Sequence, residues 1–403
     1  MKNNDKKQVG RRRFVASMSL LGVAGFGPAP RLDAQPTQSD ESSVLKVGPY
    51  LQAPRPNSIT VRWITTVPSY SWVEYGETPD QLNKKAHRVN AGLVEANTTI
   101  QAITLQNLQP GKQYAYRICS KALTGFDPYK ITYGDTFTSD VYTFTTPSVD
   151  AERVRFVVLN DIHDRPDSFA HLLQLPESPE NDYVFLNGDM LDYQTDEDQL
   201  VNHLLKPVTS LFATRVPFIL SRGNHETRGK FARQLVNYFD GHDQPFYYSF
   251  RQGPVYGIVL DSGEDKADDT PVYAGIVDFD QYRLEQAEWL KQEVRKKEFR
   301  QAKYRVVFSH IPLFYSGDWH GPMHCRTVWG PILNDANIDL LISGHTHKHG
   351  IHPAVKGEHS YPIVIGGGPQ AGRRTIISVQ ADQTALTVTM LNDTGAAIGN
   401  LII

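Results

Sequence analysis

The stretch Asp182–Asp192, DYVFLNGDMLD, joins an apolar run to Gly188-Asp189, and a second carboxylate, Asp192, follows three residues later. A short apolar run that ends in glycine predicts a buried strand followed by a sharp turn. Tyr193 comes next in the sequence. Because Gly-Asp is common in turns, this stretch alone does not say which side chain is functional. Related stretches elsewhere in the chain supply that information.

The same arrangement recurs after four other apolar runs between residues 156 and 347, and helical stretches alternate with these runs. The alternation predicts an α/β domain, in which the carboxyl ends of the strands meet at one edge of a sheet. The side chains that follow the runs are therefore expected to share one cleft, although they are distant in the sequence. These side chains are Asp161 and His163, Asp189, Asn224 and His225, His310, and His345 and His347.

This set of carboxylate, amide and imidazole groups, without thiolate, suits zinc, iron or manganese. A single histidine at a strand end is usually a capping or surface residue, but a buried cluster of imidazoles and carboxylates is costly unless it holds a cation. The set exceeds what one tetrahedral ion needs and suits two. Two ions about 3.5–4 Å apart form the clamp used in phosphoryl hydrolysis. Asp189 is the expected bridge, since it follows a middle strand.

In order along the chain, the motifs D-x-H, G-D-x-x-D, G-N-H-E, H and G-H-x-H resemble the signature of the calcineurin-like metallophosphoesterases. The resemblance extends over residues 156–347 and implies a β-sandwich flanked by helices. It also implies one ligand set for each of two metal ions, with Asp189 shared between them. The first set is Asp161, His163 and His347, and the second is Asn224, His310 and His345.

The same resemblance implies that His225 faces the scissile phosphate, stabilises developing charge and protonates the leaving oxygen. Asp192 or Glu226 is expected to orient the imidazole ligands by hydrogen bonding. An aromatic and histidine-rich loop after His310 is expected to line the mouth of the cleft, although a loop packed on its own aromatic side chains is an equal alternative. For Arg222 the alternative is a surface or salt-bridging role. The candidate substrate contacts are Arg222, Tyr315, Trp319, His320 and His324.

Residues 46–147 have the sequence pattern of an all-β domain. The segment 58–65, SITVRWIT, for example, alternates apolar and polar residues. The segment 108–118, LQPGKQYAYRI, resembles the L-x-P-G-x-x-Y corner of fibronectin type III domains. That resemblance implies a tyrosine hydroxyl tied to a loop and a buried tryptophan, for which Trp63 is suited. The expected fold is therefore a fibronectin type III-like sandwich followed by an α/β metallophosphoesterase domain over residues 150–403.

This domain order resembles the purple acid phosphatases, yet two positions differ from their pattern. Purple enzymes have G-D-x-x-Y, with the tyrosine bound to ferric iron, whereas Asp192 stands at that offset here and Tyr193 comes one residue late. Their first motif is usually Asp-x-Gly, whereas His163 stands here. We therefore expect no tyrosinate-to-iron charge-transfer band.

The first 34 residues have a basic start and an apolar run that is too short to span a membrane, which needs about 20 residues. The segment 11–15, RRRFV, resembles the twin-arginine export motif, and an ordinary secretory signal is the alternative. Residues 35–45 are expected to form a linker. The net charge of −3 gives no indication of a nucleic-acid duplex as partner, and two cysteines exclude a disulfide framework. The mature protein is expected to be extracytoplasmic and bacterial, either periplasmic or secreted.

The leading hypothesis is a secreted phosphomonoesterase with two divalent or trivalent ions, drawn from iron, zinc and manganese. A metal-bound hydroxide would attack a small phosphate ester in line. A phosphodiesterase acting on cyclic nucleotides or lipid headgroups uses the same ligands and is the first alternative. A non-catalytic binding protein on the same fold is the second. The sequence leaves the oligomeric state open.

Overall fold

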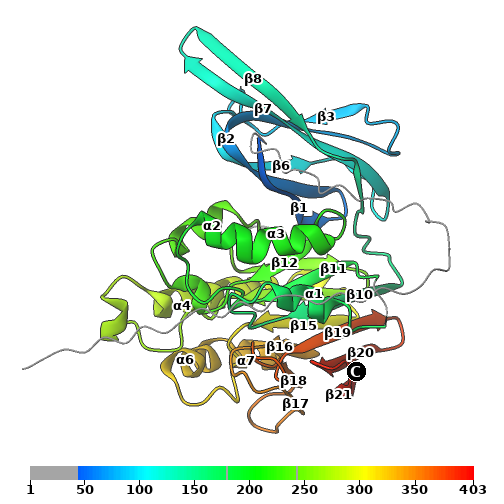
Figure 1. The fold of residues 1–403 in the computed structure, drawn as a ribbon. Helices are drawn as coiled ribbons and strands as arrows, with labels where there is room; N and C mark the ends of the chain where they lie inside the picture. The colour runs from blue at the N-terminus through cyan, green and yellow to red at the C-terminus, as the bar shows by residue number, and fades with distance from the viewer. Residues whose placement is uncertain (1–43, 178–179, 242–243) are drawn as a thin grey trace, which may run out of the picture. The chain divides into compact units, whose positions relative to one another are not determined.

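The structure is a computed structural model that describes residues 44–177, 180–241 and 244–403 (Figure 1). The expected export segment, residues 1–34, lies outside the described residues, as does most of the expected linker, residues 35–45. Strands dominate the described part up to residue 145, and two mixed sheets with helices follow.

The region at the beginning of the described chain is built around the long strand β2. This strand pairs with β1 and β6 along its first half and with β7 along its second half. Trp63 is fully buried in the core, and the Tyr114 hydroxyl accepts a 3.0 Å hydrogen bond from the Gln109 backbone N–H, as expected from the sequence. The strands are β1 (Leu45–Arg55), β2 (Ser58–Gly76), β3 (Lys84–Ala86), β4 (Val89–Asn90), β5 (Leu93–Val94), β6 (Thr98–Leu105), β7 (Gln113–Asp127), β8 (Lys130–Thr138) and β9 (Tyr142–Thr145).

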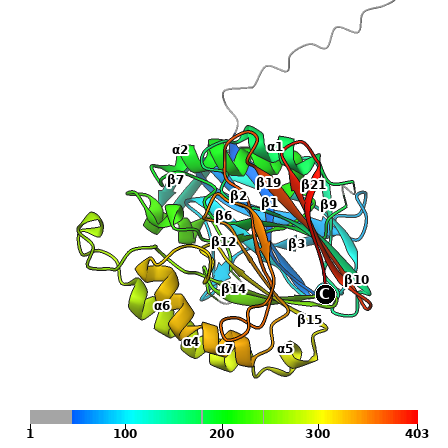
Figure 2. The same ribbon diagram turned by 90° about the horizontal axis from the view of Figure 1, so that it is seen from below.

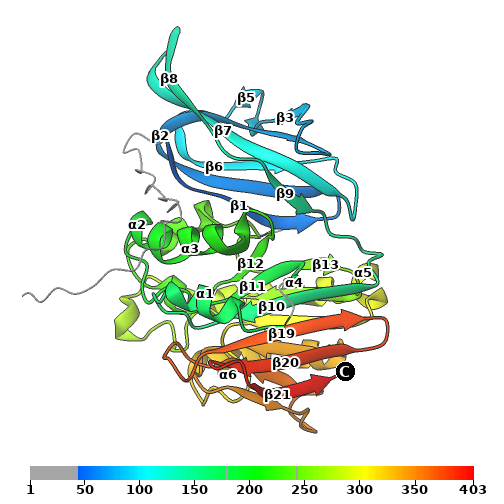
Figure 3. The same ribbon diagram turned by 45° about the vertical axis from the view of Figure 1, so that its right-hand side comes forward.

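The second region contains two six-stranded sheets, and Figure 3 shows the strand order at the edge of the first. The first sheet has the order β12-β11-β10-β19-β20-β21, and the second has the order β13-β14-β15-β16-β18-β17. The strands are β10 (Arg153–Leu159), β11 (Tyr183–Asn187), β12 (Phe218–Ser221), β13 (Tyr248–Gln252), β14 (Val255–Leu260), β15 (Tyr304–Ser309), β16 (Leu340–Ser343), β17 (Gly350–His352), β18 (Ile363–Ile365), β19 (Thr375–Asp382), β20 (Leu386–Asn392) and β21 (Ala397–Ile402).

The two sheets pack face to face through a core to which both contribute. The rings of Phe185 on β11 and Phe308 on β15 stack with centroids 3.8 Å apart. Both residues are fully buried. The outer faces are packed against helices, so this region is a β-sandwich flanked by helices, as the resemblance implied.

Helices from two parts of the chain cover the two outer faces (Figure 1). A near-continuous helical run after Asp196 covers the first sheet, and Pro207 interrupts its regular bonding because proline lacks an N–H. The helices are α1 (Asp167–Leu173), α2 (Glu197–Leu200), π-helical η1 (Val201–Leu205), α3 (Lys206–Val208), π-helical η2 (Thr209–Ala213), 3₁₀ η3 (His225–Thr227), 3₁₀ η4 (Ala232–Asn237), 3₁₀ η5 (Pro271–Tyr273), α4 (Phe279–Glu293), α5 (Lys297–Gln301), α6 (His320–Val328) and α7 (Gly330–Asp335).

Candidate metal centre

The side chains predicted to meet are positioned by parallel strand pairs in both sheets. β10, β11 and β12 run parallel in the first sheet, and β14, β15 and β16 run parallel in the second. The two sets of strands end at the same edge of the sandwich, as a contact between the two sheets demonstrates. The His345 backbone N–H, after β16 of the second sheet, donates to Asp161 Oδ2, after β10 of the first sheet, over 2.9 Å.

The backbone at these strand ends is strained. Several predicted ligands have positive φ angles, a conformation that costs a non-glycine residue about 1–2 kcal/mol. Such residues concentrate at functional sites. Gly188 also has a positive φ, and a Cβ there would lie 2.5 Å from His310 Nδ1. The ligand candidates with positive φ are Asp161 (52°), His163 (49°), Asp189 (56°), His345 (69°) and His347 (55°).

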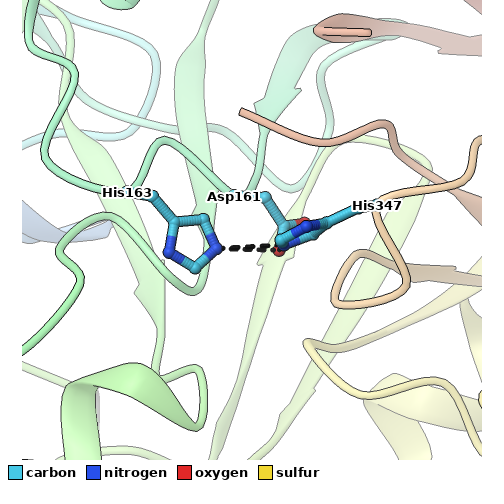
Figure 4. Close-up of side chains that lie close together, drawn as sticks. All are labelled: Asp161, His163 and His347. Atoms are coloured by element: carbon cyan, nitrogen blue, oxygen red, sulfur yellow. Dashed lines mark hydrogen bonds and ion pairs between the residues drawn. The ribbon is translucent and has the colours of Figure 1, made fainter. Parts of the chain in front are cut away.

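The first group of converging side chains is Asp161, His163 and His347 (Figure 4). Asp161 Oδ1 lies 3.5 Å from His163 Nε2 and 3.2 Å from His347 Nε2. The two imidazole nitrogens are 3.1 Å apart. Burial raises the pKa of Asp161, but the two imidazoles outweigh burial and hold the pKa well below its usual range. The carboxylate is therefore ionised and available to a cation.

The second group is Asp189, His310 and His345, with Asn224 beside it. Asp189 Oδ2 lies 3.0 Å from His310 Nε2, and His345 Nδ1 lies 3.0 Å from Asn224 Oδ1. The same Asp189 oxygen is 3.6 Å from His163 Nε2 in the first group. Asp189 thus lies between the two groups.

The hydrogen bonds fix the direction of the His310 lone pair. Its Nδ1 donates to the Asn187 carbonyl over 2.8 Å, and a carbonyl can only accept, so in the neutral ring the lone pair is on Nε2. That atom faces Asp189 without forming a hydrogen bond, and among the described residues His310 Nε2 and Asp161 Oδ1 are both buried without a hydrogen-bond partner. Facing acceptors repel each other unless a cation lies between them. The residues present therefore fit metal ions.

The electrostatics of the second group agree with this geometry. Burial lowers the pKa of His310, but Asp189 outweighs burial and raises the pKa to about 10. Burial raises the pKa of Asp189, and His310 opposes it and lowers the pKa to about 2. The pair therefore requires positive charge at His310 Nε2, which a metal ion or a proton provides.

His225 lies beside the first group and is held from both ring nitrogens. Nδ1 donates to the Asp192 carbonyl over 2.7 Å, and Nε2 lies 3.0 Å from Arg228 Nη1. A guanidinium can only donate, so His225 Nε2 is the acceptor and the ring is neutral in this arrangement. Burial lowers the pKa of His225. The ring packs edge-on against His163 with centroids 4.5 Å apart.

Asp192 and Glu226 have different positions. Asp192 Oδ1 lies 2.8 Å from His163 Nδ1, which directs His163 Nε2 toward Asp161. Among the described residues, Asp192 hydrogen-bonds to an imidazole and Glu226 does not. Its buried carboxylate accepts from the backbone N–H groups of Asp189 (2.8 Å), Met190 (2.7 Å) and Gly223 (2.8 Å). Glu226 therefore stabilises the turn that carries Asp189.

The candidate substrate contacts have other partners in this structure. The Arg222 guanidinium pairs with Asp261 at 2.7 Å, which is the salt-bridging alternative. The Tyr315 ring stacks on that of His352 with centroids 3.8 Å apart, and the Tyr315 hydroxyl lies 3.0 Å from His359 Nε2. The remaining residues of the loop also have contacts: Lys266 lies over the Trp319 ring, and His320 and His324 both approach Asp280.

Sequence reasoning missed Arg228. Its guanidinium forms two hydrogen bonds with the buried carboxylate of Glu264, of 2.7 and 2.8 Å, and this pairing aims Nη1 at His225. Arg228 lies two residues after the G-N-H-E motif, so its proximity to that motif was an available signal. Glu264 belongs to the acidic segment 261–269, and its tertiary position could not be read from composition.

Comparisons with known proteins identify the two parts of the chain. Residues 154–349 match the profile of the calcineurin-like phosphoesterase family, and residues 46–146 match that of the purple acid phosphatase N-terminal domain. The chain is 26% identical over 277 residues to acid phosphatase type 7 of Mus musculus, covering 65% of this chain and 57% of that protein. It is 25% identical over 324 residues to purple acid phosphatase 21 of Arabidopsis thaliana, covering 74% and 65%. The chain thus spans less than two thirds of the length of these relatives.

Two solved structures share the fold. Purple acid phosphatase PPD1 from yellow lupin superposes with a TM-score of 0.68 at 16% identity, covering 88% of this chain and 73% of the other. PhoD superposes with a TM-score of 0.60 at 13% identity, covering 90% and 89%. Among the described residues of this chain, none of the helices has the length and apolar character needed to cross a membrane.

Proposed function

We propose that this chain, which carries a calcineurin-like phosphoesterase domain and the N-terminal domain of the purple acid phosphatases, hydrolyses phosphate monoesters at a centre of two metal ions. The observation that carries this proposal is the position of Asp189 between two groups of converging ligands. Neither group alone requires a second ion, but a carboxylate shared by both is the arrangement that two ions need.

We propose that Asp161, His163 and His347 hold one ion, that Asn224, His310 and His345 hold the other, and that Asp189 bridges them. Bound in this way, two ions supply a clamp for phosphate oxygens and a nucleophile near neutral pH. The donor set suits iron, zinc or manganese, because it is made of oxygen and imidazole nitrogen. Asp192 would orient His163, and Glu226 would fix the turn at Asp189.

In this proposal His225 and Arg228 act on the leaving group and on developing negative charge. The Glu264 carboxylate holds the Arg228 guanidinium, so its positive charge is fixed beside His225 before substrate binds. Preorganised charge of this kind lowers the barrier because it does not need to reorient during the reaction. Proton donation by His225 requires a proton on Nε2, where Arg228 now donates, so leaving-group protonation and this contact are mutually exclusive.

The proposed enzyme is not purple. Tyr193 is exposed, with its ring centroid 6.1 Å from that of His225. Asp192, at the position of the purple enzymes' tyrosine, contacts His163 instead of offering a tyrosinate. An iron-loaded enzyme with a strong visible band that disappears in Tyr193→Phe would refute this part of the proposal.

The test of function is a comparison of p-nitrophenyl phosphate with bis(p-nitrophenyl) phosphate, together with a panel of natural monoesters, on metal-loaded enzyme. The proposal predicts a higher kcat/KM for the monoester. A preference for the bis ester would favour the phosphodiesterase alternative. The absence of turnover with every ester, despite two bound ions, would leave the binding-protein alternative.

We also propose that the protein is exported by the twin-arginine route, on the basis of residues 11–15. A folded reporter fused to residues 1–45 should reach the bacterial periplasm, and paired substitution of Arg11 and Arg12 by lysine should retain it in the cytoplasm. Unchanged export of the substituted fusion would instead indicate an ordinary secretory signal.

A further inference from the structure

Helices α4 and α6 lie side by side (Figure 2). They carry a second cluster of metal-ligand type side chains, outside the site already described. It consists of Asp280 near the beginning of α4 and of His320 and His324 on α6. Residues four apart on a helix lie one turn apart on the same face. The two imidazoles therefore face Asp280 together.

The contacts in this cluster are close. His320 Nε2 lies 2.9 and 2.8 Å from the two oxygens of Asp280, and His324 Nδ1 lies 2.9 Å from Asp280 Oδ1. The last contact is not a hydrogen bond, and His324 Nδ1 is a buried nitrogen without a hydrogen-bond partner among the described residues. His324 Nδ1 is thus close to a carboxylate oxygen but not aligned for a hydrogen bond with it. This geometry is expected of two ligands of a metal ion when the ion is not included.

We propose that Asp280, His320 and His324 form a mononuclear zinc site that is separate from the two-metal centre. Two imidazoles and one carboxylate, with a fourth position open to water, are a common ligand set for Zn²⁺. Zinc bonds of about 2.0–2.1 Å place tetrahedral ligands about 3.3 Å apart. Each imidazole nitrogen needs to move only about 0.5 Å from the Asp280 oxygen that it now contacts, which side-chain rotation provides.

The surroundings of the cluster permit entry of an ion. The side chains of Asp280 and His320 are 38% and 42% exposed, and that of His324 is 20% exposed, so an ion reaches them from solvent. Burial raises the pKa of Asp280, but a hydrogen bond to His320 outweighs burial and lowers it, so the carboxylate is ionised near neutral pH.

One neighbouring charge opposes metal binding. The buried guanidinium of Arg283 lies 2.7 Å from Asp280 Oδ1 and repels a cation. Arg283 also donates to the carbonyls of Ser262 and Glu264, so it remains fixed whether or not an ion binds. A carboxylate has about four lone-pair sites, and Asp280 Oδ2 remains available for zinc while Oδ1 serves Arg283. We therefore expect a site with moderate affinity.

The experiment counts zinc on the full chain. Enzyme whose two-metal centre has been filled, and from which excess metal has been removed, is dialysed to equilibrium against Zn²⁺, and bound zinc is measured by elemental analysis. Wild type should bind one equivalent more than His324→Gln or His320→Gln. The dissociation constant of that equivalent should rise by more than about 100-fold in each variant, because even partners of metal ligands account for about 10–100-fold.

His171→Gln is the matched control. His171 also pairs with a carboxylate, that of Asp393 at 3.0 Å, but it belongs to none of the candidate metal groups among the described residues. This variant should keep the extra equivalent. A second readout is the d–d spectrum of Co²⁺ added to enzyme in which only the two-metal centre holds zinc. The spectrum should appear in wild type and in His171→Gln and should be absent in the two α6 variants. Circular dichroism confirms that each variant is folded.

Equal zinc content in wild type and both α6 variants would overturn the proposal, whether the additional zinc is absent from all of them or bound at adventitious surface sites in all of them. If the proposed two-metal centre did not bind two ions, the zinc content of wild type and of every variant would change by the same amount. The difference in zinc content between wild type and the α6 variants therefore does not depend on the proposed function.

Discussion

At the scale of single residues, the site depends on which ring nitrogen of each histidine carries the proton. The Asn187 carbonyl fixes His310, and Asp192 fixes His163. In both histidines the partner binds Nδ1, so Nε2 is directed toward the candidate metal centre. The partner of a metal ligand therefore determines metal affinity although it does not touch the ion.

Asp192→Asn tests this dependence. The amide keeps the shape of the side chain but loses the negative charge at His163 Nδ1, so metal affinity should fall about 10–100-fold. Equilibrium dialysis against zinc measures the change. Tyr193→Phe is the control at the neighbouring position and should retain metal as wild type does, whereas equal affinity in wild type and Asp192→Asn would show that His163 is oriented by other contacts.

Arg228→Gln tests the cation beside His225. Removal of a preorganised donor typically costs about 100-fold in kcat, and we expect a loss of that order with both metals still bound. Arg228→Lys should recover little of it, since an ammonium cannot match the paired contacts to Glu264. Arg233→Gln is the control, because Arg233 is exposed and bonds only a carbonyl of Ile276 among the described contacts. An unchanged kcat in Arg228→Gln would remove Arg228 from the mechanism.

At the scale of elements, each strand end must turn sharply without losing its backbone hydrogen bonds. One buried carboxylate, Glu226, accepts short backbone bonds from Asp189 and Met190 in the turn after β11 and from Gly223 after β12. Burial and the charge of Asp189 raise the pKa of Glu226 to about 7, and the backbone donors oppose this rise. The geometry of the turn therefore depends on a carboxylate whose hydrogen bonds among the described residues go to the backbone.

Glu226→Gln should weaken this turn. The glutamine NH₂ group would face a backbone N–H, which leaves buried donors unsatisfied and costs about 2–3 kcal/mol of the free energy of unfolding. Urea denaturation of the metal-free protein measures this cost without a contribution from the ions. Glu288→Gln is the surface control, since the Glu288 side chain is 69% exposed and its pair with Lys291 contributes little. If both variants are as stable as wild type, Glu226 does not hold the turn.

At the scale of the whole molecule, the site exists because two sheets meet with their strand ends at one edge. The stacked rings of Phe185 and Phe308 join the strands that carry Asp189 and His310. Phe308→Leu should cost about 1–3 kcal/mol of unfolding free energy. It should also weaken metal binding, because it loosens the register between the sheets. Calorimetry with and without zinc measures both effects, and a destabilised variant with unchanged metal affinity would show that the strand ends are held locally.

The sequence predicted the convergence of side chains best at the strand ends, where the same kinds of residue recur in the same order. Strand-terminal Asp161, Asp189 and His345 could be predicted because glycine, apolar runs and ligand-type residues recur together. The role of Glu226 could not, because a carboxylate near an imidazole in sequence can bond the backbone instead. The pairing of Arg222 with Asp261 is the salt-bridging alternative that the sequence left open. Arg228–Glu264 and the α4–α6 cluster depend on tertiary packing, which leaves no periodic pattern in the sequence.

The central claim is that two metal ions share Asp189. Its most direct test is an anomalous difference map from crystals of the zinc-loaded protein, measured at the zinc absorption edge. The account predicts two peaks at this edge of the sandwich about 3.5–4 Å apart, one beside Asp161 and His163 and the other beside His310 and His345, with Asp189 between them. A single peak at this edge, or two peaks that do not both contact Asp189, would contradict it.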